Sequence, residues 1–324
     1  MENSAQYAAG IDIGGTNTKF GIVNKYGQIL CSGKLSTTDY PDIHQFIEKL
    51  YEELKPLIEQ AGGFDSLKGI GVGAPNGNFY SGTIEYAPNL LWKGSVPIAK
   101  LIAEKFNIPC ALTNDANAAA VGEMMYGAAK GMRDFIMITL GTGVGSGIIA
   151  NGQLILGHDG NAGELGHVIV RHGGRLHWST GMHGSLEAYA SATGISITAK
   201  EMLAKSPDQE SKLKDINEDE ITSQKVFEAA MDGDQIAQEV FKFTGKVLGE
   251  ALANFVMFSS PEAIVLFGGV TKAGTLLMDP VKENMEKNLL PIFQDKVKLI
   301  FSELKESDAA ILGASALVWD KKEI

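Results

Sequence analysis

The motif Asp12-Ile13-Gly14-Gly15-Thr16-Asn17-Thr18-Lys19 follows directly after an apolar segment at residues 7–13. The apolar segment predicts a strand, and the glycine pair predicts a turn. Two more apolar segments, at residues 20–23 and 28–31, flank a second turn at Lys25-Tyr26-Gly27. Three short strands joined by glycine turns are typical of an antiparallel meander, so we expect the chain to begin as a β-sheet.

The glycine turn of this motif also predicts an anion site. Gly14 and Gly15 have no Cβ, so their backbone N–H groups can approach a phosphate closely, and Thr16 and Lys19 add a hydroxyl and a positive charge. Asp12, at the end of the strand, is placed to hold a hydrated Mg²⁺. A plain β-hairpin is the alternative. Because a strand follows the turn, the motif is neither a P-loop nor a dinucleotide fingerprint.

A second glycine turn, Gly141-Thr142-Gly143, repeats the pattern of the first. Gly147-Ile148-Ile149 follows its threonine at the same distance as Gly21-Ile22-Val23 follows Thr16. The repeat predicts two domains built on one plan, each with a phosphate-binding hairpin, although chance similarity between glycine-rich turns is the alternative.

The remaining segments predict a mixture of strands and helices, with a polar surface loop or short helices at residues 206–219. Further strands are expected at 68–73, 110–113, 134–140, 147–150, 154–156, 263–267 and 297–301. Helices are expected at 42–60, 98–106, from Asn114 or Asp115 to 129, and at 185–205, 226–258 and 309–319.

Length and composition indicate a soluble globular protein. The 324 residues suit two domains, and 44% hydrophobic and 21% charged residues are ordinary proportions. A net charge of −11 argues against broad nucleic-acid binding. Two cysteines, Cys31 and Cys110, predict reduced thiols in a cytoplasmic protein rather than a disulfide framework. Residues 1–9 do not resemble a signal peptide, and no apolar run is long enough to span a membrane.

Asn114-Asp115-Ala116-Asn117-Ala118 lies at a predicted junction between a strand and a helix. A carboxylate at this place can accept a proton from a substrate hydroxyl, which is the main demand that phosphoryl transfer makes on a side chain. Asn and Asp are also strong helix caps, and taken alone the cap is the stronger interpretation of Asp115.

Two acids and a histidine follow in a short stretch, in Gly163-Glu164-Leu165-Gly166-His167 and Leu186-Glu187. Carboxylates and imidazoles hydrogen-bond neighbouring hydroxyls, so the three side chains suit a neutral sugar. Taken one at a time, a surface glutamate and a structural histidine are the stronger interpretations.

Together these motifs resemble the ROK family of sugar kinases and sugar-responsive repressors. The resemblance runs from about Tyr7 to Trp319. Its most specific pieces are residues 12–19, 114–119, 140–147 and 163–167, followed by Gly184-Ser185-Leu186-Glu187-Ala188-Tyr189.

The resemblance implies an α/β fold of the two-domain actin-like ATPase type (ribonuclease H-like), with the active site in the cleft between the domains. We expect a smaller domain at 1–120 plus 310–324 and a larger one at 121–309. The implied activity is ATP-dependent phosphorylation of a hexose at its 6-hydroxyl, glucose first, in a homo-oligomer (dimer or tetramer).

The resemblance also assigns roles to individual residues. Asp115 would be the catalytic base, and Asp12 would hold Mg²⁺ through water. The sugar would be bound by Asn76, Asn89, Asn114, Asp115, Glu164, His167 and Glu187. ATP would be bound by Gly14, Gly15, Thr16, Asn17, Lys19, Gly141, Thr142, Gly143, Gly268 and Gly269.

One departure from the family concerns zinc. Family members usually bind it through the histidine at position 167 and three cysteines, but the cysteine positions here hold Trp178, Thr180 and Ser185. Because zinc favours Cys and His ligands, we expect no structural zinc. We expect Trp178 to fill the space and His167 to bond the sugar. A different metal site built from His172, His177 or His183 is the alternative.

Three other functions are consistent with parts of the pattern. A repressor of the same family usually carries a helix-turn-helix domain first, and eleven residues before Asp12 are too few for one. A kinase for N-acetylglucosamine, N-acetylmannosamine, mannose or fructose would use much the same residues. A chaperone-type or cytoskeletal ATPase of the same superfold would need no sugar pocket.

Overall fold

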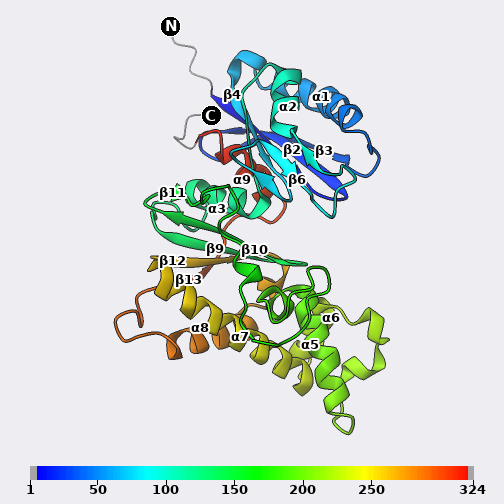
Figure 1. The fold of residues 1–324 in the computed structure, drawn as a ribbon, viewed down its shortest axis with the longest axis vertical. Helices are drawn as coiled ribbons and strands as arrows, with labels where there is room; N and C mark the ends of the chain where they lie inside the picture. The colour runs from blue at the N-terminus through cyan, green and yellow to red at the C-terminus, as the bar shows by residue number, and fades with distance from the viewer. Residues whose placement is uncertain (1–5, 320–324) are drawn as a thin grey trace. The chain divides into compact units, whose positions relative to one another are not determined.

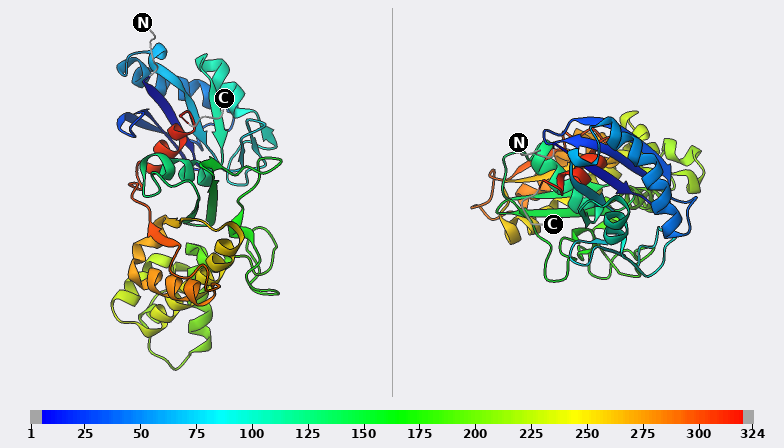
Figure 2. Two further views of the ribbon diagram at one scale, coloured as in Figure 1. Left: turned by 90° about the vertical axis from the view of Figure 1, so that its left-hand side faces the viewer. Right: turned by 90° about the horizontal axis from the view of Figure 1, so that it is seen from above.

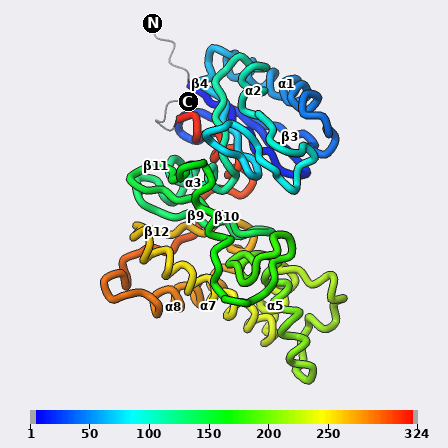
Figure 3. The backbone as a smooth tube through the Cα atoms, in the orientation of Figure 1, coloured from blue at the N-terminus to red at the C-terminus, as the bar shows by residue number. Residues whose placement is uncertain are grey.

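The computed structural model describes residues 6–319 and divides into two compact units. Unit 1 comprises Met1–Arg133, Gly147–Gly163 and Ser302–Ile324, and unit 2 comprises Asp134–Ser146 and Glu164–Phe301. Figure 3 shows that blue, cyan and red stretches of the chain share unit 1. Residues 1–5 and 320–324 lie outside the described residues. The first range holds most of residues 1–9, which were predicted not to form a signal peptide. The second range holds the end of the predicted smaller domain.

The predicted domain boundaries at 120/121 and 309/310 stay a prediction. The compact units divide the chain differently, because a cut at residue 120 would fall inside helix α3 (Asp115–Tyr126), which belongs wholly to unit 1. Unit 1 also takes in residues 147–163, which pass through strand β11 (Gln153–Leu154).

The first sheet of unit 1 begins with the predicted meander. β1 (Tyr7–Ile13), β2 (Asn17–Asn24) and β3 (Ile29–Ser36) pair antiparallel, and β4 (Leu67–Gly73) and β8 (Cys110–Thr113) then join in parallel. The order is β3-β2-β1-β4-β8. A smaller antiparallel sheet, β5 (Gly77–Asn78), β6 (Thr83–Glu85) and β7 (Ser95–Val96), follows β4 in the chain.

Helices cover both faces of this first sheet (Figure 1). α1 (Ile43–Gln60) and α2 (Ile98–Phe106) contact one face, where Ala9, Ile11 and Ile13 of β1 join the main hydrophobic core. The alternate residues of β1 point to the opposite face of the sheet, as the two-residue period of a strand requires. There Gly10 and Gly71 let α9 (Ala309–Ala316) lie directly on the sheet.

The second sheet repeats the plan of the first. Its order is β11-β10-β9-β12-β13, with β9 (Phe135–Leu140), β10 (Val144–Ala150), β12 (Ala263–Phe267) and β13 (Lys298–Phe301). β10 and β11 are antiparallel, whereas β9, β12 and β13 are parallel, as in the corresponding part of the first sheet. The repeated Gly-Thr turns therefore do mark two sheets of one topology.

Helices of unit 2 gather around the long α7 (Gln235–Ser259). α4 (Glu187–Ala190), α5 (Ala192–Lys205), α6 (Ser223–Met231) and α8 (Thr275–Lys287) all contact it. Figure 2 shows α7 and α8 side by side. A Cβ on Gly249 would lie 2.4 Å from the Val281 carbonyl oxygen, so the two helices depend on glycine for their close approach.

Several predicted helices were wrong in their extent. The expected helix at 185–205 breaks at Ser191, which caps α5, and the one at 226–258 breaks where Asp234 caps α7. The helix that opens after Asn114 ends at Tyr126 rather than at 129. α8, which contains Pro280, was not predicted. No helix among residues 6–319 is both long and apolar enough to cross a membrane.

Gly71→Ala tests how much unit 1 depends on the contact between α9 and the sheet. A Cβ at this position would lie 1.9 Å from the Ala314 carbonyl oxygen. We expect the free energy of unfolding to fall by about 3 kcal/mol, because overpacking against backbone cannot be relieved by a side-chain rotation. Urea denaturation measures the change. Gly269→Ala is the control, since nothing lies within 4 Å of its Cβ, and equal stability of the two variants would contradict the prediction.

Candidate functional site

The register of the first sheet brings three distant parts of the sequence to one edge. Asp12 of β1 pairs with Gly73 of β4, and Gly73 pairs with Thr113 of β8. All three strands are parallel and end here, so the residues that follow them meet at the same carboxyl edge. Ligands of α/β sheets bind outside such edges. The predicted residues 14–17, Asn76, Asn114 and Asp115 all follow these three strand ends.

The glycine turn after β1 is held by backbone hydrogen bonds. Gly14 N–H donates to the Asn17 carbonyl at 3.0 Å, and the Thr16 carbonyl accepts from Thr37 N–H at 2.8 Å. A Cβ on Gly15 would lie 2.7 Å from the Asn89 carbonyl oxygen. The structure therefore brings Asn89 against the turn, and Gly15 is required for that close contact.

Asn114, not Asp115, caps helix α3. Its Oδ1 accepts from Asn117 N–H at 2.7 Å, while the Asp115 carboxylate accepts from its own backbone N–H and from Ala116 N–H, the latter at 2.9 Å. The cap interpretation of Asp115 is thus wrong. The Asp115 side chain is exposed at the surface of unit 1. Neighbouring protein atoms nevertheless displace water from around its carboxyl group, and this desolvation raises its pKa.

Asp12 and Asp115 lie within electrostatic reach of each other. Burial, followed by the charge of Asp115, raises the pKa of Asp12 to about 6, and Lys19, its partner across β1 and β2, acts in the opposite direction. Two carboxylates with raised pKa values near one lysine leave negative charge poorly compensated. A divalent cation would compensate it, so the donor set fits Mg²⁺.

Asn76 has a strained backbone in the turn after β4. Its φ is 52°, and its Nδ2 donates to the Glu85 carbonyl at 2.9 Å. The turn is closed by Gly77 N–H, which donates to the Ala74 carbonyl at 3.0 Å. Left-handed non-glycine residues cluster at functional sites, and within residues 6–319 the Asn76 Oδ1 accepts no hydrogen bond, so it can serve a ligand.

The second sheet has its own carboxyl edge. Thr139 of β9 pairs with Phe267 of β12, and both strands end within two residues. A Cβ on Gly268, whose φ is 106°, would lie 2.6 Å from the Leu140 carbonyl oxygen. The parallel register therefore gathers the predicted ATP residues of unit 2, which are Gly141, Thr142, Gly143, Gly268 and Gly269.

Glu187 connects the predicted sugar cluster to this glycine turn. Its Oε2 accepts from Val144 N–H at 2.7 Å, and a Cβ on Gly143 would lie 2.4 Å from the same oxygen. The turn itself is held by Thr193, whose hydroxyl donates to the Thr142 carbonyl at 3.0 Å. A glycine at position 143 is therefore needed to admit the carboxylate.

Glu164 precedes the short helix η2 (Leu165–His167), and His167 is the last residue of that helix. η2 lies against β10, because a Cβ on Gly166 would be 2.0 Å from the Val144 carbonyl oxygen. Glu164 is exposed, and His167 is half-buried. The Nδ1 of His167 is buried without a hydrogen-bond partner among the described residues, which is costly unless a ligand or water bonds it.

His177 lies beside Glu187, and the sequence did not predict this contact. It is buried, and its Nε2 lies 2.6 Å from Glu187 Oε1. Its ring is 5.9 Å from that of His167. Among the described residues, His167, His177 and Glu187 form a group whose potential metal-ligand atoms lie within 4.8 Å of one another. His172 and His183 are not members of it.

The residues at the family's zinc positions do not supply zinc ligands. Trp178 is 44% exposed and stacks on the His177 ring at 4.2 Å, so the expectation that it fills a space was wrong. Thr180 is exposed, and Ser185 is buried with its hydroxyl unpartnered among residues 6–319. A tryptophan, a threonine and a serine are not the thiolate ligands that zinc prefers.

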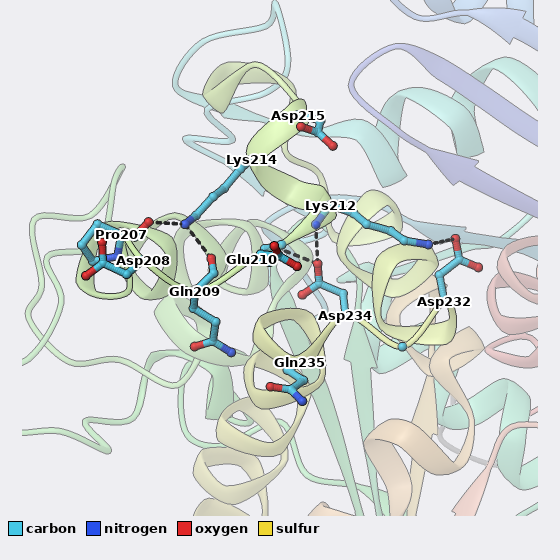
Figure 4. Close-up of a pocket in the computed structure, with 12 residues that line it drawn as sticks. Pro207, Asp208, Gln209, Glu210, Lys212, Lys214, Asp215, Asp232, Asp234 and Gln235 are labelled. Atoms are coloured by element: carbon cyan, nitrogen blue, oxygen red, sulfur yellow. Dashed lines mark hydrogen bonds and ion pairs between the residues drawn. The ribbon is translucent and has the colours of Figure 1, made fainter.

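A hollow of about 910 Å³ lies elsewhere on unit 2, between residues 207–215 and 232–235 (Figure 4). Several of its charged groups bond the surrounding loop. Lys214 Nζ donates to three backbone carbonyls, Lys212 pairs with Asp232, and Asp234 caps α7 while accepting from Ser211 and Lys212. These bonds hold the surface loop together, and none of the predicted site residues lines the hollow.

Comparison with known proteins gives consistent matches over nearly the whole chain. A model of the ROK family matches residues 8–321. The glucokinase of Halalkalibacterium halodurans is 35% identical over 317 residues, covering 97% of this chain and 96% of the relative. The glucokinase of Thermotoga maritima is 30% identical over 324 residues, covering 96% and 97%.

A solved structure matches equally widely. The crystal structure of a ROK family glucokinase from Streptomyces griseus, in complex with glucose and AMPPNP, has a TM-score of 0.77 at 31% identity. The match covers 96% of this chain and 98% of that one. The expected α/β fold of the two-domain, actin-like sugar kinases is thereby confirmed.

Asp12→Asn tests the strain that the buried carboxylate imposes. The folded chain raises the pKa of Asp12 from 3.8 to about 6, so the folded state binds the proton more tightly, and stability falls as pH rises through this window. Removing the charge should therefore stabilise the protein at pH 7, by up to about 3 kcal/mol at 1.4 kcal/mol per pKa unit. The gain should shrink as pH falls to 4.

Thermal unfolding at several pH values, in buffer with a chelator, measures this effect. Asp39→Asn is the matched control, because it removes the same charge from an exposed position. If Asp12→Asn were no more stable at pH 7 than this control, the ionised Asp12 carboxylate would not destabilise the folded protein.

Proposed function

The chain belongs to the ROK family, and from that premise we propose that it transfers the γ-phosphoryl group of ATP to the 6-hydroxyl of a hexose, glucose first. The observation that carries the proposal is the placement of Asp115. Its carboxylate is not used as the helix cap, has a raised pKa, and lies at the edge where the glycine turn after β1 also ends. The glucokinases that match this chain support the substrate.

Asp115 acts as the base in this proposal. Its carboxylate accepts the proton of the 6-hydroxyl as that oxygen attacks the γ-phosphorus. The new P–O bond forms while the bond to the β-phosphate oxygen breaks, and ADP leaves with the electron pair. A raised pKa makes the carboxylate a stronger base than a fully hydrated one.

The glycine turns are proposed to hold the phosphates. Gly14, Gly15, Thr16, Asn17 and Lys19 in unit 1, and Gly141, Thr142 and Gly143 in unit 2, offer backbone N–H groups, hydroxyls and one ammonium. Gly268 and Gly269 would border the adenosine. Asp12 would hold Mg²⁺ through its water shell, and the ion would neutralise charge on the phosphates when bound.

Sugar binding is proposed for residues of both units. In unit 1 these are Asn76, Asn89, Asn114 and Asp115, and in unit 2 they are Glu164, His167 and Glu187. The unpartnered Nδ1 of His167 supports this assignment, since a sugar hydroxyl would supply the missing hydrogen bond. A homo-oligomer in the cytoplasm, where ATP is available, completes the proposal.

Asp115→Asn should nearly abolish turnover while leaving sugar binding largely intact. The amide keeps the size of the side chain but cannot take the proton, so kcat should fall by about 10³-fold. Steady-state kinetics measure kcat, and titration calorimetry measures sugar affinity. In the wild type, log(kcat/KM) should rise with pH along an acid limb displaced above the ordinary aspartate range, because burial raises this pKa.

A variant that keeps a tenth or more of the wild-type kcat would remove Asp115 from the mechanism. Loss of sugar affinity together with kcat would instead assign it a binding role.

A panel of sugars decides the substrate. We expect glucose to give the highest kcat/KM in a coupled assay for ADP, followed by mannose, fructose, N-acetylglucosamine and N-acetylmannosamine. If an N-acetyl sugar were turned over much faster than glucose, the substrate assignment would fall and the kinase assignment would stand. ATP hydrolysis at full rate without any sugar would exclude both.

A further inference from the structure

The carboxylate of Glu187 is fixed from two sides by groups of unit 2. Val144 N–H donates to Oε2 at 2.7 Å, and the His177 ring nitrogen Nε2 meets Oε1 at 2.6 Å. An ionised carboxylate accepts about four hydrogen bonds, two at each oxygen. Two of these sites are therefore filled by the protein, and the remaining lone pairs are held in fixed directions.

The other nitrogen of His177 shows which atom carries the proton. Its Nδ1 accepts from two backbone donors, Thr180 N–H at 3.2 Å and Ser179 N–H at 3.3 Å. A backbone N–H can only donate, so Nδ1 must be unprotonated. The neutral ring then carries its hydrogen on Nε2, and the bond to Glu187 is an N–H···O⁻ hydrogen bond of the stronger, charge-assisted type.

The same geometry argues against a metal ion between these groups. Two ligands of a tetrahedral zinc, each about 2.0 Å from the ion, lie about 3.3 Å apart. The separation of 2.6 Å between Nε2 and Oε1 is too short for that and is normal for a direct hydrogen bond. A metal at Nε2 would also require the ring proton to move to Nδ1, where the two backbone donors point.

We propose that His177 is a positioning residue that orients Glu187 for the sugar through a direct hydrogen bond, with its tautomer set by the backbone of residues 179 and 180 and with no metal ion. The role of Glu187 in sugar binding rests on the proposed function. Trp178 supports the arrangement, because it stacks on the His177 ring with an angle of 24° between the planes. The ring is nearly inaccessible, at 2% exposure, so it keeps one orientation.

Kinetics of two substitutions test the positioning role. His177→Phe keeps a flat ring beside Trp178 but removes the donor, and should raise the KM for the hexose about 10- to 100-fold, which is the loss of one hydrogen bond to a charged group. The KM for ATP should change less than about twofold. His177→Gln restores an N–H donor at similar reach and should recover most of the hexose affinity.

The matched control is His183→Phe. His183 belongs to the same segment but is exposed and bonds the Gly174 carbonyl instead of Glu187. It should leave both KM values unchanged. If the phenylalanine variant at 177 kept a wild-type hexose KM, or if the glutamine variant were no better than phenylalanine despite equal thermal stability, the positioning role would be wrong.

A second measurement does not depend on activity. In protein labelled with ¹⁵N-histidine, the His177 signal, identified by its loss in His177→Gln, should show a neutral ring protonated at Nε2. A ring protonated at Nδ1, or one stoichiometric zinc per chain in elemental analysis of the wild type, would overturn the inference. If the wild type phosphorylated no hexose, the proposed function would fail, while the tautomer and metal results would still decide the state of His177.

Discussion

The parallel pairing of β1, β4 and β8 is the constraint on which unit 1 depends. One register places Asp12, Gly73 and Thr113 in a row, although they are separated by up to 101 positions in the sequence. A slip of one residue would turn Ile11 and Ile13 out of the core, so burial of those side chains fixes the row. The residues at the carboxyl edge are thus positioned by the packing of buried side chains on one face of the sheet.

Much of the fold could be predicted from local patterns. The meander, α1 and α2 follow from strand and helix periodicity with glycine turns between them. The errors in helix length arise where a single side chain starts a new helix. Ser191 and Asp234 each begin a new helix by accepting a backbone hydrogen bond inside a segment that otherwise has the composition of one helix. α8 was missed, and its internal Pro280 is not a sufficient reason, because α1 was predicted despite Pro56.

The candidate site was predictable in its residue types and not in its arrangement. Glycine turns and Asp115 are visible in the sequence, but the charge repulsion between Asp12 and Asp115 arises only once β1 and β8 share an edge. His177 was the hardest to predict. Its position ten residues before Glu187 has no helical or strand periodicity, and its role depends on two N–H groups of the following residues.

The segment that carries His177 and Glu187 contains no thiol. The two free cysteines, Cys31 and Cys110, belong to unit 1, and burial raises the pKa of both, which keeps them in the unreactive thiol form. A loop joined by hydrogen bonds between imidazole, carboxylate and backbone has no thiolate for peroxide to oxidise, although Met182 within it carries a thioether. In the arrangement that we propose, the loop also has no ion for a competing chelator to withdraw, so zinc starvation should leave its geometry unchanged.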